Sequence, residues 1–69
     1  MGRKRRSDLD MVECELGRAA QALRRAYLAF DQTADPDLIE AWTFEIRAQK
    51  ARYAYLLRQR KHLEEGNTG

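Results

Sequence analysis

The sequence has few of the residues that small domains use as covalent or metal-based supports. Cys14 is its one cysteine and His62 its one histidine among 69 residues. A disulfide within the chain is therefore excluded, and structural zinc, which needs about four Cys or His ligands, has no ligand set. One thiol and one imidazole without a third orienting group also make a poor catalytic site. We predict a protein that is not an enzyme, holds no metal or cofactor and takes no small-molecule substrate.

Long apolar runs are absent as well. No stretch approaches the roughly 18 apolar residues that a bilayer-spanning helix requires, and the first residues carry Arg and Lys rather than an apolar segment. These features predict a cytoplasmic protein with no membrane insertion.

Glycine and proline are scarce, with four and one residues, while charged residues make up 35% of the chain. This balance suits long, solvent-exposed helices better than strands or disorder. The net charge of +2, from 13 basic and 11 acidic residues, is too balanced to indicate a nucleic-acid binder by composition alone. An all-α fold is the expected class.

The first helix is predicted over residues 8–31, after a basic, disordered tail over residues 1–7. Ser7 and Asp10 form a variant of the capping box that starts helices. Apolar residues then recur at alternating spacings of three and four, which is the a/d pattern of a helix seam. Ala20 and Tyr27 broaden this seam. Its members are Leu9, Val12, Leu16, Ala19, Leu23, Ala26 and Phe30.

The turn is predicted over residues 32–35 and the second helix over residues 36–65. Pro36 favours an extended Asp35, as a helix N-cap requires, and itself suits the first helical position. Gly66 is the expected terminating residue, with residues 66–69 frayed. The second helix has its own seam, formed by Ile39, Trp42, Ile46, Gln49, Tyr53, Leu56, Arg60 and Leu63.

Two helices joined by a short turn are expected to fold back as an antiparallel hairpin. The register that we predict opposes Ala19 to Ile46 and Leu9 to Leu56. Gln49 is interpreted as a polar seam residue that sets this register at some cost in stability.

A second apolar group follows the second helix at nearly the opposite side from its seam. A two-helix hairpin cannot cover both sides, and so small a domain needs extra burial. The sequence therefore predicts self-association into a homodimeric four-helix bundle and a surface that also docks a protein partner. The alternative is a solvent-exposed face. This group, called the Phe44 surface below, consists of Ala41, Phe44, Ala48, Ala51 and Tyr55.

A basic stripe lies between the two apolar sides of the second helix, and it consists of Arg47, Lys50, Arg58 and Lys61. The hairpin brings the basic tail beside its far end, so nucleic acid is the alternative partner, bound through phosphates. A solvated helix face is the simpler interpretation, given the small net charge. The tail residues concerned are Arg3, Lys4, Arg5 and Arg6.

Two segments carry a resemblance to a known family. Residues 35–39, Asp-Pro-Asp-Leu-Ile, are followed by residues 51–58, Ala-Arg-Tyr-Ala-Tyr-Leu-Leu-Arg. Together they resemble the YaaL-like family of small bacterial proteins, and Tyr-x-Tyr-Leu-Leu-Arg is the specific part. The resemblance implies a small cytoplasmic protein of Gram-positive bacteria, with no catalytic or ligand residues to transfer.

Overall fold

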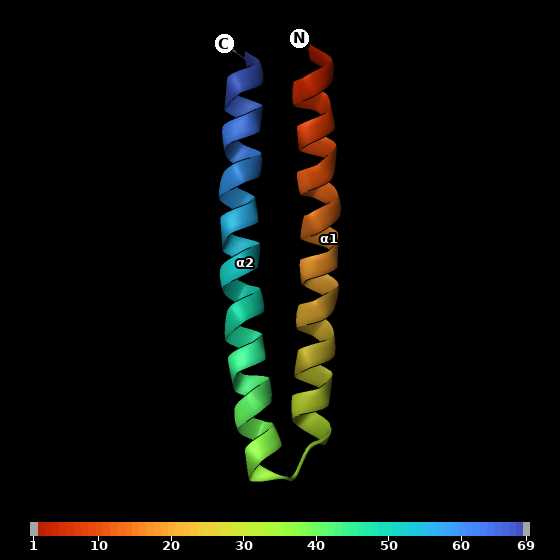
Figure 1. Cartoon of the computed structure of the whole chain (residues 1–69), viewed down its shortest axis with the longest axis vertical. Helices are drawn as coiled ribbons and strands as arrows, with labels where there is room; N and C mark the ends of the chain where they lie inside the picture. The colour runs from red at the N-terminus through yellow and green to blue at the C-terminus, as the bar shows by residue number, and fades with distance from the viewer. Residues whose placement is uncertain (1, 69) are drawn as a thin grey trace.

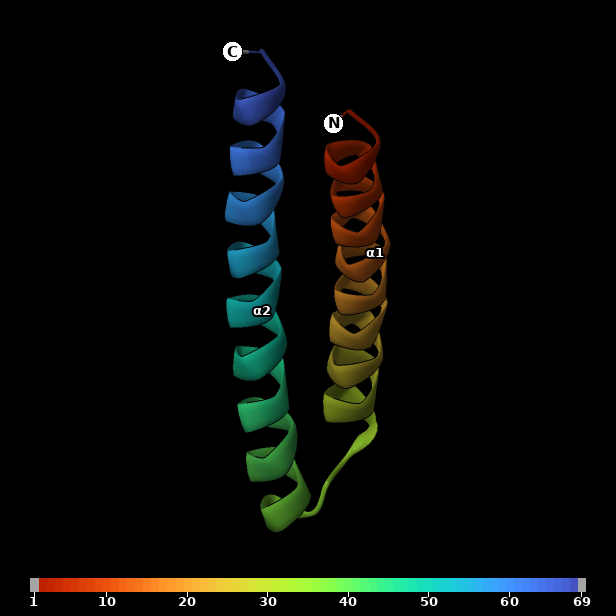
Figure 2. The same cartoon turned by 45° about the horizontal axis from the view of Figure 1, so that its top comes forward.

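The computed structural model describes the backbone of residues 2–68 and the side chains of residues 8–66. Two helices, α1 (Gly2–Gln32) and α2 (Pro36–Thr68), make up this part of the chain, which contains no strand. They run antiparallel and side by side in both views (Figures 1 and 2). The hairpin measures 51 × 14 × 12 Å. The predicted all-α helical hairpin is therefore confirmed.

The turn between the helices is built on Asp35. Its Oδ1 atom accepts hydrogen bonds from the backbone N–H groups of Asp37, at 2.8 Å, and Leu38, at 3.3 Å. Its carbonyl accepts the first helical bond, from Ile39 N–H at 2.9 Å. These are the contacts of a helix N-cap, and Pro36 follows as the first helical residue. The predicted start of the second helix is confirmed.

Both helices extend further at the open end of the hairpin than the sequence predicted. α1 begins at Gly2 rather than at residue 8, so residues 2–7 continue the helix instead of forming a disordered tail. Arg and Lys are good helix formers and nothing after Gly2 interrupts them, so Ser7 does not act as the start. α2 runs to Thr68, and Gly66 does not adopt the positive φ of a terminating glycine. The cap signals at this end are overridden by helix propensity.

The core lies along the predicted seams. The buried apolar residues of the described part are Leu16, Ala19, Ala26, Ile46 and Leu56, and all five are seam positions. Leu16, Ala19 and Leu56 form one cluster, against which Val12 and Tyr53 pack. The heptad spacing therefore identified the buried side of each helix correctly.

The register differs from the predicted one by one heptad. Leu56 packs with Leu16 rather than with Leu9, and continuing along the two seams toward the turn opposes Ala26, not Ala19, to Ile46. Both pairings join seam positions, because the seams repeat every seven residues. Because the turn spans residues 33–35, Leu56 lies farther from it along the chain than Leu16 does, and α2 extends past the end of α1 at the turn (Figures 1 and 2).

Two ion pairs between described side chains join the helices. Arg52 Nη2 lies 3.0 Å from Glu15 Oε1, and Arg60 Nη1 lies 3.4 Å from Glu13 Oε1. Gln49 does not reach across the hairpin through its amide nitrogen, which donates to Glu45 Oε2 on the same helix at 3.0 Å. Over the described residues, neither helix is apolar enough to span a bilayer.

Candidate interaction surfaces

The Phe44 surface lies uncovered on α2. All five of its residues are exposed, and Phe44 and Tyr55 retain 61% and 51% of their accessible surface. At 100° per residue they point nearly away from Ile46 and Leu56, which face α1. The hairpin therefore leaves this surface uncovered. The sequence predicted that a two-helix hairpin could not cover it.

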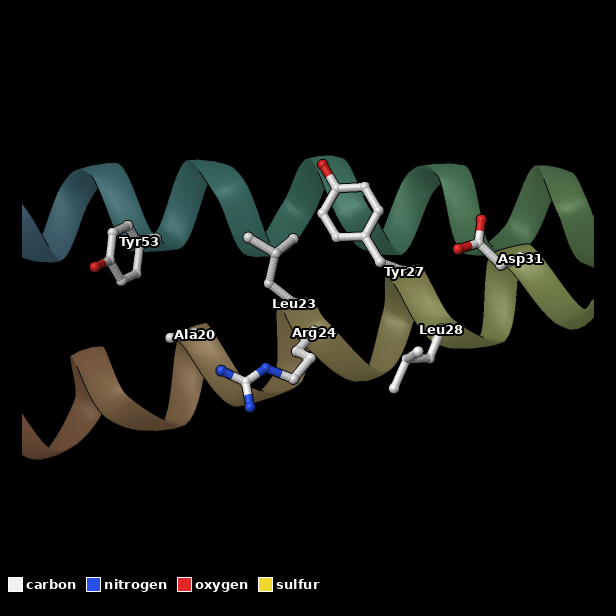
Figure 3. Close-up of a pocket in the computed structure, with 7 residues that line it drawn as sticks. All are labelled: Ala20, Leu23, Arg24, Tyr27, Leu28, Asp31 and Tyr53. Carbon is white, nitrogen blue, oxygen red and sulfur yellow. The ribbon is translucent and has the colours of Figure 1, made fainter.

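A second apolar surface, which the sequence analysis did not identify, lies along one side of the hairpin. We call it the Tyr27 groove. It has a volume of about 460 Å³ and is lined mainly by apolar side chains of α1, with one residue of α2. In Figure 3 the side chains of Leu23 and Tyr27 extend from α1 toward α2. The lining residues are Ala20, Leu23, Arg24, Tyr27, Leu28, Asp31 and Tyr53.

The Tyr27 groove continues toward the turn. A second hollow of about 390 Å³ shares Tyr27 and Asp31 with it and adds Ile46, Arg47 and Lys50. Lys50 Nζ stands 5.7 Å from the centroid of the Tyr27 ring, within the range of a cation–π contact. Lys50 therefore forms a rim of the groove, while Tyr27 remains 41% exposed.

The hollow between the helices that adjoins Gln49 has a different character. It has a volume of about 230 Å³ and contains the ion pairs of Glu15 with Arg18, at 3.4 Å, and with Arg52. Its charged groups are thus paired with one another. The Tyr27 groove has a larger and more apolar lining. The grooves of the hairpin are therefore unequal, one polar and one apolar.

Sequence reasoning missed the Tyr27 groove because its residues appeared to serve the seam. Ala20 and Tyr27 were interpreted as broadening the buried stripe of the first helix, yet both are exposed. Tyr53, from α2, completes the lining only in the observed register. The one usable signal was the width of the apolar stripe on the first helix.

The basic stripe is solvent-exposed along α2. Arg47, Lys50, Arg58 and Lys61 are all exposed. Lys50 contacts the Tyr27 ring, whereas the other three form no ion pair with a carboxylate of the described side chains. The structure thus presents these four cations together. For Arg3, Lys4, Arg5 and Arg6 the backbone belongs to α1, but their side chains lie outside the described residues.

Cys14 and His62 are both exposed. Among residues with described side chains, no group of three or more His, Cys, Asp or Glu is placed to hold a metal ion. Comparison of the chain with protein-family models, with curated proteins and with solved structures gives no match.

Proposed function

We propose that this protein is a non-enzymatic helical-hairpin interaction module that self-associates and docks a protein partner. The observation that carries the proposal is the amount of surface that one hairpin leaves exposed. The chain exposes 5676 Å², whereas a compact monomer of 8.1 kDa exposes about 4,500 Å². The excess, about 1,200 Å², exceeds the ~800 Å² that each partner covers in a standard interface.

The chemistry of the exposed surface supports the same proposal. Five apolar residues are buried in the described part, and two of them are alanines, so the hairpin core is small. Large apolar side chains outnumber them on the surface. These exposed side chains are Met11, Tyr27, Leu28, Leu38, Phe44, Tyr55 and Leu57. Covering them removes apolar area from water, at about 25 cal/mol per Å².

Sedimentation equilibrium of the full chain at micromolar concentrations tests self-association. We expect a mass of twice the 8.1 kDa of one chain, with dissociation on dilution. A protein that sediments as a monomer at every concentration would contradict the proposal, because the exposed apolar area would then be tolerated in water.

The basic stripe supports a second candidate function, binding to the phosphate backbone of DNA or RNA. Its specific support is that Arg47, Arg58 and Lys61 are exposed and form no ion pair with a described carboxylate. Such binding must weaken steeply with salt, because each neutralised phosphate releases counterions.

A titration of duplex DNA and of RNA at low and at moderate salt tests this candidate. Replacing Arg58 and Lys61 together by Gln should lower the slope of log affinity against log salt concentration. The decrease should correspond to about two fewer neutralised phosphates. Arg18→Gln is the matched control, because Arg18 pairs with Glu15 in the polar groove. Absence of binding at low salt removes this candidate.

A further inference from the structure

We infer that the Tyr27 groove seats a second copy of this chain, so that two hairpins form a four-helix bundle and the Phe44 surface stays on its outside. The inference rests on the proposed self-association and assigns it to one of the two uncovered apolar surfaces. It thereby separates the self-association site from the surface left for a protein partner.

The positions of the two surfaces on the hairpin differ. The Phe44 surface belongs to α2 alone and lies nearly opposite the side that contacts α1, so a hairpin seated there would leave α1 out of the new core. The Tyr27 groove is lined from both helices, by Leu23 and Tyr27 of α1 and Tyr53 of α2. In a four-helix bundle every helix contributes to one common core, and of the two uncovered apolar surfaces the Tyr27 groove meets that condition.

The two grooves of the hairpin differ in how strongly they are charged. In the polar groove Glu15 already pairs with Arg18 and Arg52, so covering it would require dehydration of paired charges, which is costly. In the Tyr27 groove the lining is mainly apolar, and Tyr27 and Leu28 keep 41% and 54% of their surface exposed. A second copy gains most by covering this side.

Charge decides how the second copy lies. The α2 rim of the groove carries Arg47 and Lys50, and Arg58 and Lys61 continue the same stripe. On the α1 rim, one cation and one anion, Arg24 and Asp31, balance each other. A copy that laid α2 over α2 would oppose four cations to four cations, which is strongly disfavoured.

The favoured arrangement lays α1 of each copy over α2 of the other. Two hairpins that face each other in this way are related by a two-fold axis along their length, so both turns lie at the same end of the bundle. All neighbouring helices then run antiparallel, as in up-and-down bundles.

Matched substitutions distinguish the two surfaces. Ala20 lines the groove, and Ala51 lies on the Phe44 surface; both are exposed helical alanines. In the observed register they lie at nearly the same level along the hairpin. Glu has a helix propensity close to that of Ala, and neither substitution removes a core side chain. Ala20→Glu should raise the dissociation constant of the dimer by at least about tenfold, since it would bury a charge, whereas Ala51→Glu should leave it unchanged.

The outcomes separate this inference from the proposed function. A wild-type chain that is monomeric overturns both. If the wild-type chain is a dimer that Ala51→Glu weakens and Ala20→Glu does not, the inference is overturned and the proposed self-association stands. The same holds if both substitutions weaken the dimer equally. Circular dichroism of both variants checks that each retains the helical hairpin.

A distance measurement tests the orientation. Ala34 is an exposed turn residue, and a spin label on Ala34→Cys, in a chain with Cys14→Ser, reports the separation of the two turns. Turns at the same end should bring the labels within about 30 Å, three times the ~10 Å spacing of packed helices. Labels separated by about the 51 Å length of the hairpin would contradict the proposed orientation.

Discussion

At the scale of single residues, Asp35 decides where the chain reverses. Its carboxylate satisfies the N–H groups of Asp37 and Leu38, which have no partner within the helix. On the other side of the turn, Thr33 Oγ1 donates to the carbonyl of Ala29 at 2.7 Å, and Thr33 N–H donates to that of Phe30 at 3.3 Å. Residues of the turn therefore contribute hydrogen bonds to both helix ends.

We expect Asp35→Ala to lower the free energy of unfolding by about 1 kcal/mol, because two helix N–H groups lose their acceptor. Asp35→Asn is the control, since its side-chain oxygen can still cap the helix. Thermal unfolding followed by circular dichroism, at equal protein concentrations, measures the difference. Equal melting temperatures for the two variants would show that the cap does not stabilise the hairpin.

At the scale of the helices, the seam and its register define the hairpin. Leu56 retains 8% of its surface and lies in the cluster with Leu16 and Ala19, while its neighbour Leu57 retains 36%. Two leucines adjacent in sequence thus occupy a core position and an exposed position of the same helix. Substitutions at these two leucines therefore compare the effect of burial on stability for the same type of side chain.

Leu56→Ala should destabilise the protein by about 2–5 kcal/mol through lost burial and the cavity left behind. Leu57→Ala should cost the hairpin less, because its side chain already keeps 36% of its surface exposed to water. Chemical denaturation monitored by the fluorescence of Trp42 measures both. If Leu57→Ala proved the more damaging, then the side of α2 that faces α1 would have been assigned incorrectly.

At the scale of the whole molecule, one hairpin buries too little for its size. Its extents of 51 × 14 × 12 Å describe a rod only two helices wide, and below about 70–80 residues a single core rarely supplies more than ~3–5 kcal/mol. The chain has one cysteine and so no internal disulfide, and the proposed self-association is a source of the additional burial that so small a domain needs.

The melting temperature should therefore rise with protein concentration, because association stabilises the folded chain by mass action. Ala20→Glu should remove most of this dependence, whereas Ala51→Glu should preserve it. A dilution series in differential scanning calorimetry makes the comparison. A wild-type melting temperature independent of concentration would indicate that the hairpin is stable alone.

Local features of the sequence determined the all-α class, the turn and the buried side of each helix. The cap at Asp35 and Pro36 acts over three or four residues, and the alternating spacing of Leu16, Ala19 and Ala26 fixes one face of a helix whatever lies opposite. The helix ends near residues 2 and 68 were less predictable, because weak cap signals there compete with the high helix propensity of their neighbours.

Only the tertiary structure decided the register and, with it, the Tyr27 groove. A seam that repeats every seven residues looks the same after a shift of one heptad, so its periodicity cannot distinguish Leu9 from Leu16 as the partner of Leu56. In the structure the packing of Leu56 with Leu16 and Ala19 makes that choice. The shift brings Tyr53 beside Leu23 and Tyr27, and a groove lined from two helices exists only once their relative position is set.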